Sequence, residues 1–335
     1  MRYRCSFSLK SNRLLILLLI IIVLSMVKKQ LIPYWKHSQN CVSEGVIFAE
    51  RDVGGLSPEE VRTVIEQVAN VLEIPPVNAV LDAANNGVIP GLNGLAVDIE
   101  KTLALIMEAQ KGETVSPVFT QLEPEVNLAA FPEHPIYQGN PLKDQVVFLI
   151  NVAWGNEHLQ DLLTVLKENQ VQATFFLVGR WVKGNEKEAR IIAESGFEIA
   201  SHGYSDALSM QEASLETARE DIRRAADTIE EICGIRPIYF SPHRGELSAA
   251  VLKAAALENN RTIMWTVDTV DWMLPGVDVM VNKILTQAVG GSLILMHPTE
   301  QTAEFLRQVI PRLKAKGLEP VSLSTLLCPV RNPKE

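Results

Sequence analysis

Gln145 to Gly155, QVVFLINVAWG, is the stretch of this chain that decides the fold. Its apolar run from Val146 to Ile150 is typical of a buried strand, and it leads directly into a polar turn at Asn151. Further short apolar runs along the chain end in polar motifs in the same way. The strands predicted on this pattern cover residues 145–150, 173–178, 198–200, 238–240, 262–266, 292–296 and 319–322.

Helical patterns occupy the gaps between these strands, at residues 157–169, 186–195, 215–232, 248–257, 277–287 and 302–316. This alternation with short loops favours a parallel sheet with crossover helices. We therefore expect an α/β fold, an incomplete TIM-like (β/α)7 barrel, over residues 136–330. In such a barrel the loops that follow the strands build the active site. The polar residues predicted to share that site are Asn151, His202, Ser241, Asp268, Asp271 and His297.

Residues 42–133 have a different pattern and predict a small α+β domain. Ser57, Pro58 and Glu60 form the N-cap, first helical position and capping box of one helix. Strands are expected at 77–82 and 115–122, and a second helix between 97 and 111. The segment has no cluster of His, Cys or paired acids. PEHPIYQGNP, residues 132–141, is the expected linker to the barrel.

The first 36 residues predict a membrane segment. An apolar run, residues 14–27, follows Arg2, Arg4, Lys10 and Arg13 and is closed by Lys28 and Lys29. As a helix it would be about 21 Å long, short of the ~30 Å hydrocarbon core, although flanking basic residues can snorkel. The excess of basic residues before the run predicts a cytoplasmic N-terminus and an exported remainder. We expect a single-pass anchor, the alternative being a cleaved signal peptide.

The formal net charge of −9 argues against nucleic acid as a partner, because no excess of basic groups would offset phosphate repulsion.

The strand-end motifs resemble those of the polysaccharide (chitooligosaccharide, NodB-homology) deacetylase family. The resemblance rests on INVAWGNE at 150–157, SHGYSD at 201–206, FSPHRGE at 240–246, WTVDTVDW at 265–272 and ILMHPTEQTAE at 294–304. These variants are similar to those of a sporulation-associated, membrane-anchored subgroup of endospore-forming bacteria. Residues 42–133 resemble peptidoglycan-binding-like domains, a plain spacer being the alternative. The resemblance implies a cell-wall glycan, peptidoglycan or a chitin-like oligomer, as partner.

The resemblance also implies a mechanism. N-deacetylation in this family uses a divalent metal such as zinc, held by His and Asp, to activate a water molecule. A carboxylate removes the proton from that water, and an imidazolium protonates the leaving amine. The first motif supplies the base and then a metal ligand. The second supplies two His ligands, and the third an Arg that fixes the base. The fourth motif supplies an Asp that tunes the pKa of the general acid, and the His of the fifth motif is that acid.

Carried onto this chain, the first three motifs are altered. Asn151 occupies the base position and cannot accept a proton, and Val152 occupies the ligand carboxylate position. His202 keeps one imidazole, but Asp206 stands where its partner His belongs. Ser241 replaces the Arg, and Pro242 keeps the shape of the turn. We expect Ser241 and Pro242 in substrate contact.

The fourth and fifth motifs are retained: Asp268, Asp271 and His297 are the predicted catalytic groups. Trp154 and Trp272 are predicted either to stack on sugar rings or to pack the barrel rim.

Several alternatives stay open at this point. His202 and Asp206 are the expected zinc ligands, but the metal could be absent and His202 purely structural. Glu157, His158 and His243 could rebuild a metal site with them. The chain is thus a cell-surface deacetylase with an altered site, a catalytically silent glycan-binding protein that uses the same cleft, or a structural protein at the membrane.

Overall fold

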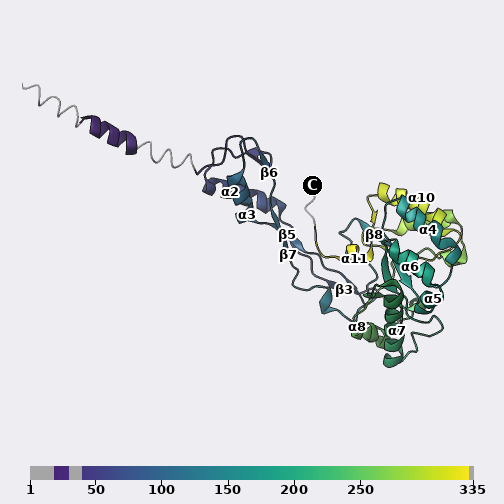
Figure 1. Ribbon diagram of the computed structural model, residues 1–335. Coiled ribbons are helices and arrows are strands. Elements are labelled where there is room, and N and C mark those ends of the chain that lie inside the picture. The colour runs from purple at the N-terminus through teal and green to yellow at the C-terminus, as the bar shows by residue number, and fades with distance from the viewer. Residues whose placement is uncertain (1–18, 30–39, 332–335) are drawn as a thin grey trace, which may run out of the picture. The chain divides into compact units, whose positions relative to one another are not determined.

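The computed structural model describes residues 19–29 and 40–331 (Figure 1). The described chain divides into two compact units that interleave along the sequence. The first unit takes residues up to Pro75 together with Gly94–Leu122, and the second takes Pro76–Asn93 and the chain from Glu123 onward. The predicted domain limits, 42–133 and 136–330, follow chain order and stay a prediction.

The predicted membrane segment lies partly outside the described residues. Residues 19–29 are helical. Among the described residues, no helix has the length and hydropathy that a membrane crossing requires.

The first unit is a small α+β structure, as the sequence predicts. Ser57 caps α2 (Pro58–Leu72), and its capping box with Glu60 is formed as expected. A second helix, α3 (Ile99–Glu108), is capped by Asp98 and packs on α2. The short strands of the unit are β1 (Ile47–Phe48), β2 (Arg51–Asp52), β5 (Gly94–Val97), β6 (Thr114–Val115) and β7 (Phe119–Leu122). Apolar faces of both helices close over Val46 and Phe48 to form its core.

The second unit contains an eight-stranded sheet in which every pair is parallel. Its order is β12-β11-β10-β9-β8-β14-β13, and β15 also pairs with β8. The strands are β8 (Gln145–Val152), β9 (Thr174–Leu177), β10 (Glu198–Ser201), β11 (Tyr239–Phe240), β12 (Arg261–Thr262), β13 (Val267–Asp268), β14 (Leu293–Met296) and β15 (Glu319–Pro320). The predicted strand 262–266 is wrong over most of its length: only Thr262 lies in a strand, and residues 263–266 connect β12 to β13.

The sheet curls because β12 and β13 stand at its two ends and yet are joined by residues 263–266 alone. Five peptide steps reach at most about 18 Å, so the two edges lie close together. Ile136 occupies the gap and pairs in parallel with Ile263, while Gln138 bridges to Ser292 beside β14. The result is the incomplete barrel that the sequence predicts.

Helices cover the outside of the barrel (Figure 1). They are α4 (Asn156–Glu168), α5 (Gly179–Gly184), α6 (Glu186–Glu194), α7 (Leu215–Cys233), α8 (Ala249–Leu257), α9 (Val277–Gln287) and α10 (Thr302–Ala315). The short helix α11 (Leu323–Leu327) packs instead with Val147 and Leu149, on the inner side of β8. All six predicted helices are present, and α5 and α11 are additional. Three 3-10 turns complete the described elements: η1 (Leu128–Ala130), η2 (His243–Gly245) and η3 (Asp271–Met273).

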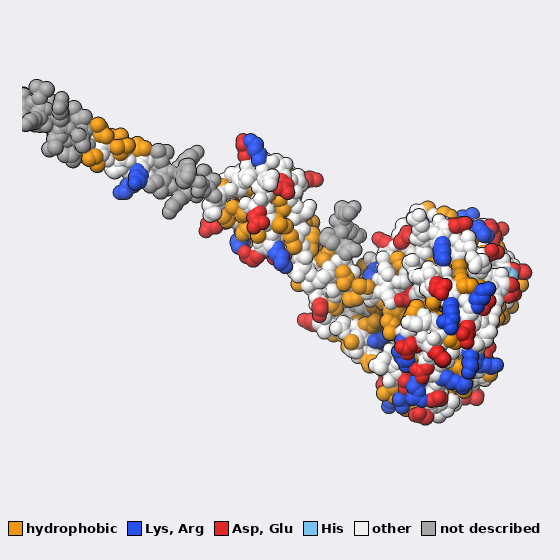
Figure 2. All heavy atoms as spheres, viewed as in Figure 1, with side chains coloured by type: hydrophobic (Ala, Val, Ile, Leu, Met, Phe, Trp, Pro, Cys, Tyr) orange, Lys and Arg blue, Asp and Glu red, His pale blue; other side chains and the backbone are white. Residues whose placement is uncertain are grey.

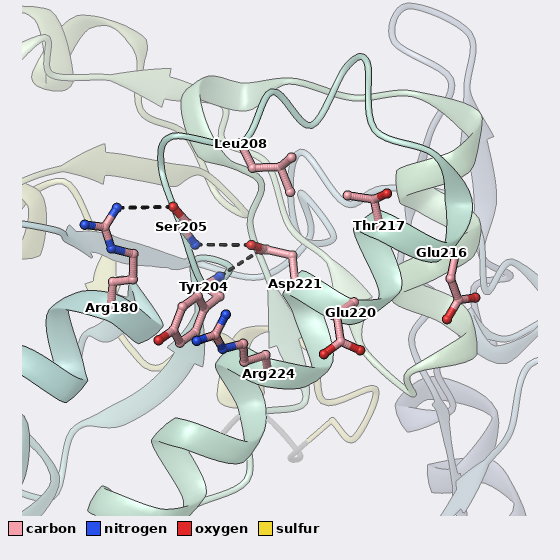
Figure 3. A pocket seen from close by; sticks show the side chains of 9 residues that line it. All are labelled: Arg180, Tyr204, Ser205, Leu208, Glu216, Thr217, Glu220, Asp221 and Arg224. Carbon is pink, nitrogen blue, oxygen red and sulfur yellow. Dashed lines mark hydrogen bonds between the residues drawn. The ribbon is translucent and has the colours of Figure 1, made fainter.

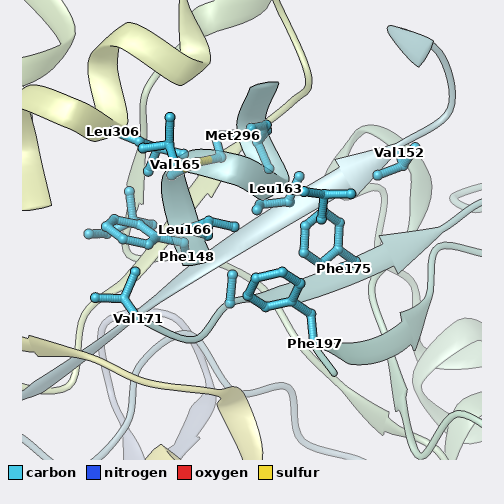
Figure 4. Close-up of a cluster of buried hydrophobic side chains, with 14 of the residues drawn as sticks. Phe148, Val152, Leu163, Val165, Leu166, Val171, Phe175, Phe197, Met296 and Leu306 are labelled. Atoms are coloured by element: carbon cyan, nitrogen blue, oxygen red, sulfur yellow. The ribbon is translucent and has the colours of Figure 1, made fainter. Parts of the chain in front are cut away.

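Alternate side chains of strand β8 point to the two layers of the barrel core, one outside the sheet and one inside it. Val146, Phe148, Ile150 and Val152 pack against the helices, where Phe175 and Leu163 meet them (Figure 4). Val147 and Leu149 point to the barrel interior. The hairpin of β3 (Val80–Asp82) and β4 (Gly87–Ile89) contributes Ala79 and Val88 to this inner layer. Asn151 continues the inward series at the carboxyl end of the strand.

Candidate active site

The predicted site residues meet in one cleft of about 730 Å³ at the carboxyl ends of the barrel strands. This volume is within the range that small-molecule sites occupy. The cleft is lined by Asn151, Ala153, Trp154, His202, Asp206, His243, Arg244, Trp265, Asp268, Trp272, Leu295 and His297. Of the predicted residues, Ser241, Pro242 and Asp271 lie outside this lining. Ala153, Arg244 and Trp265 are cleft residues that the sequence did not indicate, and Leu295, also in the lining, belongs to the retained fifth motif.

The end of β8 decides which side chains can enter the cleft. Consecutive residues of a strand point to opposite faces, so Asn151 faces the cleft while Val152 is fully buried against the helices. Assigning a ligand position to Val152 is therefore wrong. The strand ends at Val152, and the bend that follows brings both Ala153 and Trp154 to the cleft.

The chain then turns at Gly155, whose φ is +81°. A Cβ there would lie 2.0 Å from the carbonyl oxygen of Pro298, so only glycine fits this junction.

His202 is held in one tautomer by the backbone. Its Nδ1 donates to the Ser241 carbonyl oxygen over 2.8 Å, which leaves the lone pair of Nε2 directed to the cleft side. The Asn151 amide nitrogen lies 3.4 Å from that Nε2. Burial, followed by the nearby His243, lowers the pKa of His202 well below its usual value. Ser241 thus contributes its backbone carbonyl, while the residue itself is buried.

His243 is the buried neighbour of His202. The two rings meet edge to face with centroids 4.7 Å apart. Burial lowers the pKa of His243 to about 4, although Asp206 acts in the opposite direction. Its buried Nε2 has no hydrogen-bond partner among the described residues. Asp206 thus acts electrostatically on His243, and it is not among the groups that shift the pKa of His202.

His297 is oriented by a fully buried carboxylate. Asp271 accepts a hydrogen bond from His297 Nδ1 at 2.9 Å and another from its backbone N–H at 2.6 Å. The Thr302 hydroxyl lies 3.3 Å from Asp271 and 2.7 Å from the His297 carbonyl oxygen, which is its nearer acceptor. On its other side the His297 ring stacks on Trp154, with centroids 5.8 Å apart and planes 8° from parallel. This pairing fixes the imidazole at the cleft wall.

The turn η3 directs the side chains of Asp271 and Trp272 in different directions. Val270 and Leu274, which flank it, both have left-handed backbone, with φ of 58° and 50°. Such conformations are costly for a β-branched residue and are concentrated at functional sites. Asp268 stabilises the bend by accepting from the Val270 N–H at 2.7 Å. Asp271 therefore points inward while Trp272 is 56 % exposed at the cleft.

Third-motif Arg244 also enters the cleft, and its guanidinium pairs with Glu246 at 2.9 Å. It lies three residues after the position where the family motif places its arginine.

The described residues do not fit a zinc ion. Among them, no three His, Cys, Asp or Glu side chains are close enough together to hold a metal. Glu157 and His158 lie in the first turn of α4, contact each other at 3.6 Å, and do not border the cleft. They therefore do not rebuild a metal site with His202, Asp206 and His243. The cleft offers imidazoles and the carboxylates of Asp206 and Asp268, but no carboxylate from the end of β8.

Comparison with known proteins agrees with this architecture. Residues 138–263 match the polysaccharide deacetylase family, and residues 54–116 match a putative peptidoglycan binding domain. The uncharacterized protein YlxY of Bacillus subtilis is 41 % identical over 75 % of this chain and 78 % of its own length. A peptidoglycan-N-acetylglucosamine deacetylase of Bacillus cereus is 30 % identical over 50 % of this chain and 80 % of its own.

Among solved structures, a CE4 family pseudoenzyme from Bacillus anthracis is 34 % identical, with a TM-score of 0.71 over 81 % of this chain and 96 % of its own. A mutant of that pseudoenzyme is described as having restored enzymatic activity. The order of the strand-end motifs, the curled parallel sheet and these relatives lead to one conclusion: the chain belongs to the polysaccharide deacetylase family.

Proposed function

We propose that this protein is a catalytically silent member of its family that binds cell-wall glycan in the barrel cleft. The observation that carries the proposal is the end of β8, which presents Asn151, Ala153 and Trp154 to the cleft and no carboxylate. A water molecule at the end of β8 would therefore have no carboxylate base from that strand, and the described residues offer no set of metal ligands.

The missing groups act together in the chemistry, so their loss is severe. Loss of a general base alone typically removes about 10²–10⁴ in rate. The family places its two catalytic carboxylates side by side in the first motif. Because Val152 points into the core, two adjacent cleft-facing positions exist only at Ala153 and Trp154. We propose these as the positions of the lost carboxylates.

Glycan binding is supported by what the cleft retains. Trp154 and Trp272 are 45 % and 56 % exposed on its wall, and flat indole faces pack well on sugar rings. The match of residues 54–116 to a peptidoglycan binding domain supports the same polymer as partner. Attachment to the membrane through the apolar run of residues 14–27 completes the proposal, supported by its basic flanks. The link to spore formation rests on resemblance alone and stays a prediction.

One observation favours residual deacetylase activity as a second candidate. His297 is held by Asp271 in the orientation that a general acid needs, with its Nε2 free of that contact. The two candidates differ in whether acetate is released. The test is acetate release from a chitin oligomer and from peptidoglycan, together with the metal content of the purified protein. Stoichiometric zinc with turnover that His202→Ala abolishes would refute the silent reading.

Reversion of the site tests the proposed carboxylate positions. We expect Ala153→Asp with Trp154→Asp and Ser241→Arg to bind zinc and to release acetate. Asn151→Asp alone, at the base position predicted from sequence, should do neither. Activity in the single variant would instead place the base at Asn151.

Binding is measured by calorimetry with an N-acetylglucosamine oligomer. Trp154→Ala and Trp272→Ala should each weaken binding by about two- to tenfold, the range that aromatic stacking supplies. Met273→Ala is the matched control, because Met273 is 62 % exposed next to Trp272 but does not line the cleft. Equal affinity in all three variants would show that the cleft is not the glycan site.

A further inference from the structure

A second pocket, of about 740 Å³, opens beside the cleft and shares no lining residue with it. It lies between α5, α7 and the loop that follows β10 (Figure 3). Arg180 enters from α5, Arg224 from α7, and Tyr204 and Ser205 from the loop. Nothing in the deacetylase chemistry uses these residues.

The acidic groups of this pocket are already engaged. Glu216 and Glu220 also line it, but Glu216 pairs with Arg219 at 3.5 Å and Glu220 pairs with Arg223. The Asp221 carboxylate accepts the backbone N–H groups of Tyr204 at 2.8 Å and Ser205 at 3.2 Å. Acidic and basic side chains are intermingled in the same way over the face of the barrel that Figure 2 shows.

The two pocket arginines are not engaged in this way. Neither has a carboxylate within salt-bridge distance among the described residues. Arg180 donates to the Ser205 hydroxyl over 3.4 Å. The guanidinium carbon of Arg224 lies 3.7 Å from the ring centroid of Tyr204. The pocket therefore holds two guanidinium groups, one over the Tyr204 ring and one beside Ser205, in a chain whose net charge is −9.

The pocket is also built in advance of any ligand. Tyr204 can lie against the start of α5 because residue 179 is glycine, where a Cβ would be 2.7 Å from the Tyr204 ring. The ring in turn supports the Arg224 guanidinium by a cation–π contact. Preorganised arginine forks match the oxygens of carboxylates and phosphates.

We propose that this pocket binds an oxyanion, a carboxylate or a phosphate, between Arg180 and Arg224. The loop from His202 to Asp206 separates it from the cleft, since Tyr204 and Ser205 line the pocket while His202 and Asp206 line the cleft. The ligand chemistry has two sources in a cell wall, the carboxylates of peptide stems and the phosphodiesters of anionic polymers.

Calorimetry on the full chain at constant ionic strength tests the proposal with inorganic phosphate and acetate as probes. A muramyl dipeptide and a glycerol phosphate oligomer then distinguish the two sources. We expect saturable binding, weakened at least about tenfold in Arg180→Gln and in Arg224→Gln, as loss of a charge-assisted hydrogen bond predicts. Arg224→Lys should retain part of the affinity, because it keeps the charge and loses the fork.

Arg307→Gln is the matched control. Arg307 is an exposed arginine of α10 that pairs with Glu304 at 3.5 Å, so the variant removes the same charge away from the pocket. Thermal melts establish that each variant is folded. Affinity that falls equally in Arg307→Gln, or no saturable binding of any probe up to about 20 mM, would overturn the proposal.

Discussion

The buried His243 makes the barrel sensitive to acid, and the size of the effect follows from the structure. Its pKa is about 4 in the folded protein, against 6.5 for an ordinary histidine. The unfolded chain therefore binds a proton more readily than the folded one between these two values. The free energy of unfolding therefore has its full value, with respect to His243, above pH 6.5, and it decreases as the pH falls toward 4.

The magnitude is set by the difference between the two pKa values, 6.5 − 4 = 2.5. At about 1.4 kcal/mol per pKa unit, the complete loss is about 3 kcal/mol. About 2 kcal/mol of this falls between pH 7 and pH 5. His202, whose pKa burial also lowers, acts in the same direction.

Urea unfolding followed by tryptophan fluorescence measures the effect, since Trp154, Trp181, Trp265 and Trp272 all lie in the barrel unit. The wild type and His243→Gln are compared at pH 7 and pH 5. Glutamine does not titrate, so the variant should lose about 2 kcal/mol less than the wild type over this interval. Carboxylates elsewhere and the intrinsic cost of the substitution cancel in the comparison. An equal loss in both proteins would refute the reasoning.

Three further changes are predicted from local geometry, each measured by urea unfolding. Gly155→Ala should cost clearly more than the roughly 1–2 kcal/mol of a left-handed alanine, because its Cβ meets the Pro298 carbonyl. Gly196→Ala is the control, because Gly196 has a similar φ of 79° but open space around it. Equal costs for the two substitutions would contradict this account. Asp271→Ala should cost about 2–3 kcal/mol, because the backbone N–H and the ring Nδ1–H of His297 both lose their acceptor, and a change below about 0.5 kcal/mol would argue against it. Ser57→Ala should destabilise the first unit by about 1 kcal/mol, and unchanged unfolding would show that its capping box contributes nothing.

The order of strands and helices could be predicted from sequence because each β/α unit has its own hydrophobic period. Helix α7, for example, begins at the predicted Leu215 and ends at Cys233 beside the glycine C-cap Gly234. Helix α5 has no side-chain cap and both begins and ends with glycine, so nothing local marks it. Residues 263–266 are apolar enough to predict a strand, yet they connect β12 to β13, and Ile263 forms only an isolated bridge to Ile136, which no local pattern reveals.

The site could be predicted in outline only. Motifs at strand ends were enough to bring His202, Asp268 and His297 into one cleft. The position of Val152 in the motif does not predict its environment. Whether its side chain points to the cleft or to the helices depends on the register of β8 and on where that strand ends. The sequence indicates His243 only as an alternative metal ligand, because its burial against His202 depends on the approach of two turns that are far apart in the chain.

The hairpin of β3 and β4 has a consequence for how this protein can be divided. The polypeptide passes from one unit to the other after Pro75, after Asn93 and after Leu122, so no single cut releases an intact barrel. A recombinant fragment beginning at the linker would leave Ala79 and Val88 behind and open the inner layer of the barrel to water. Gene fusion or recombination at that point would remove the same two side chains from the inner layer of the barrel.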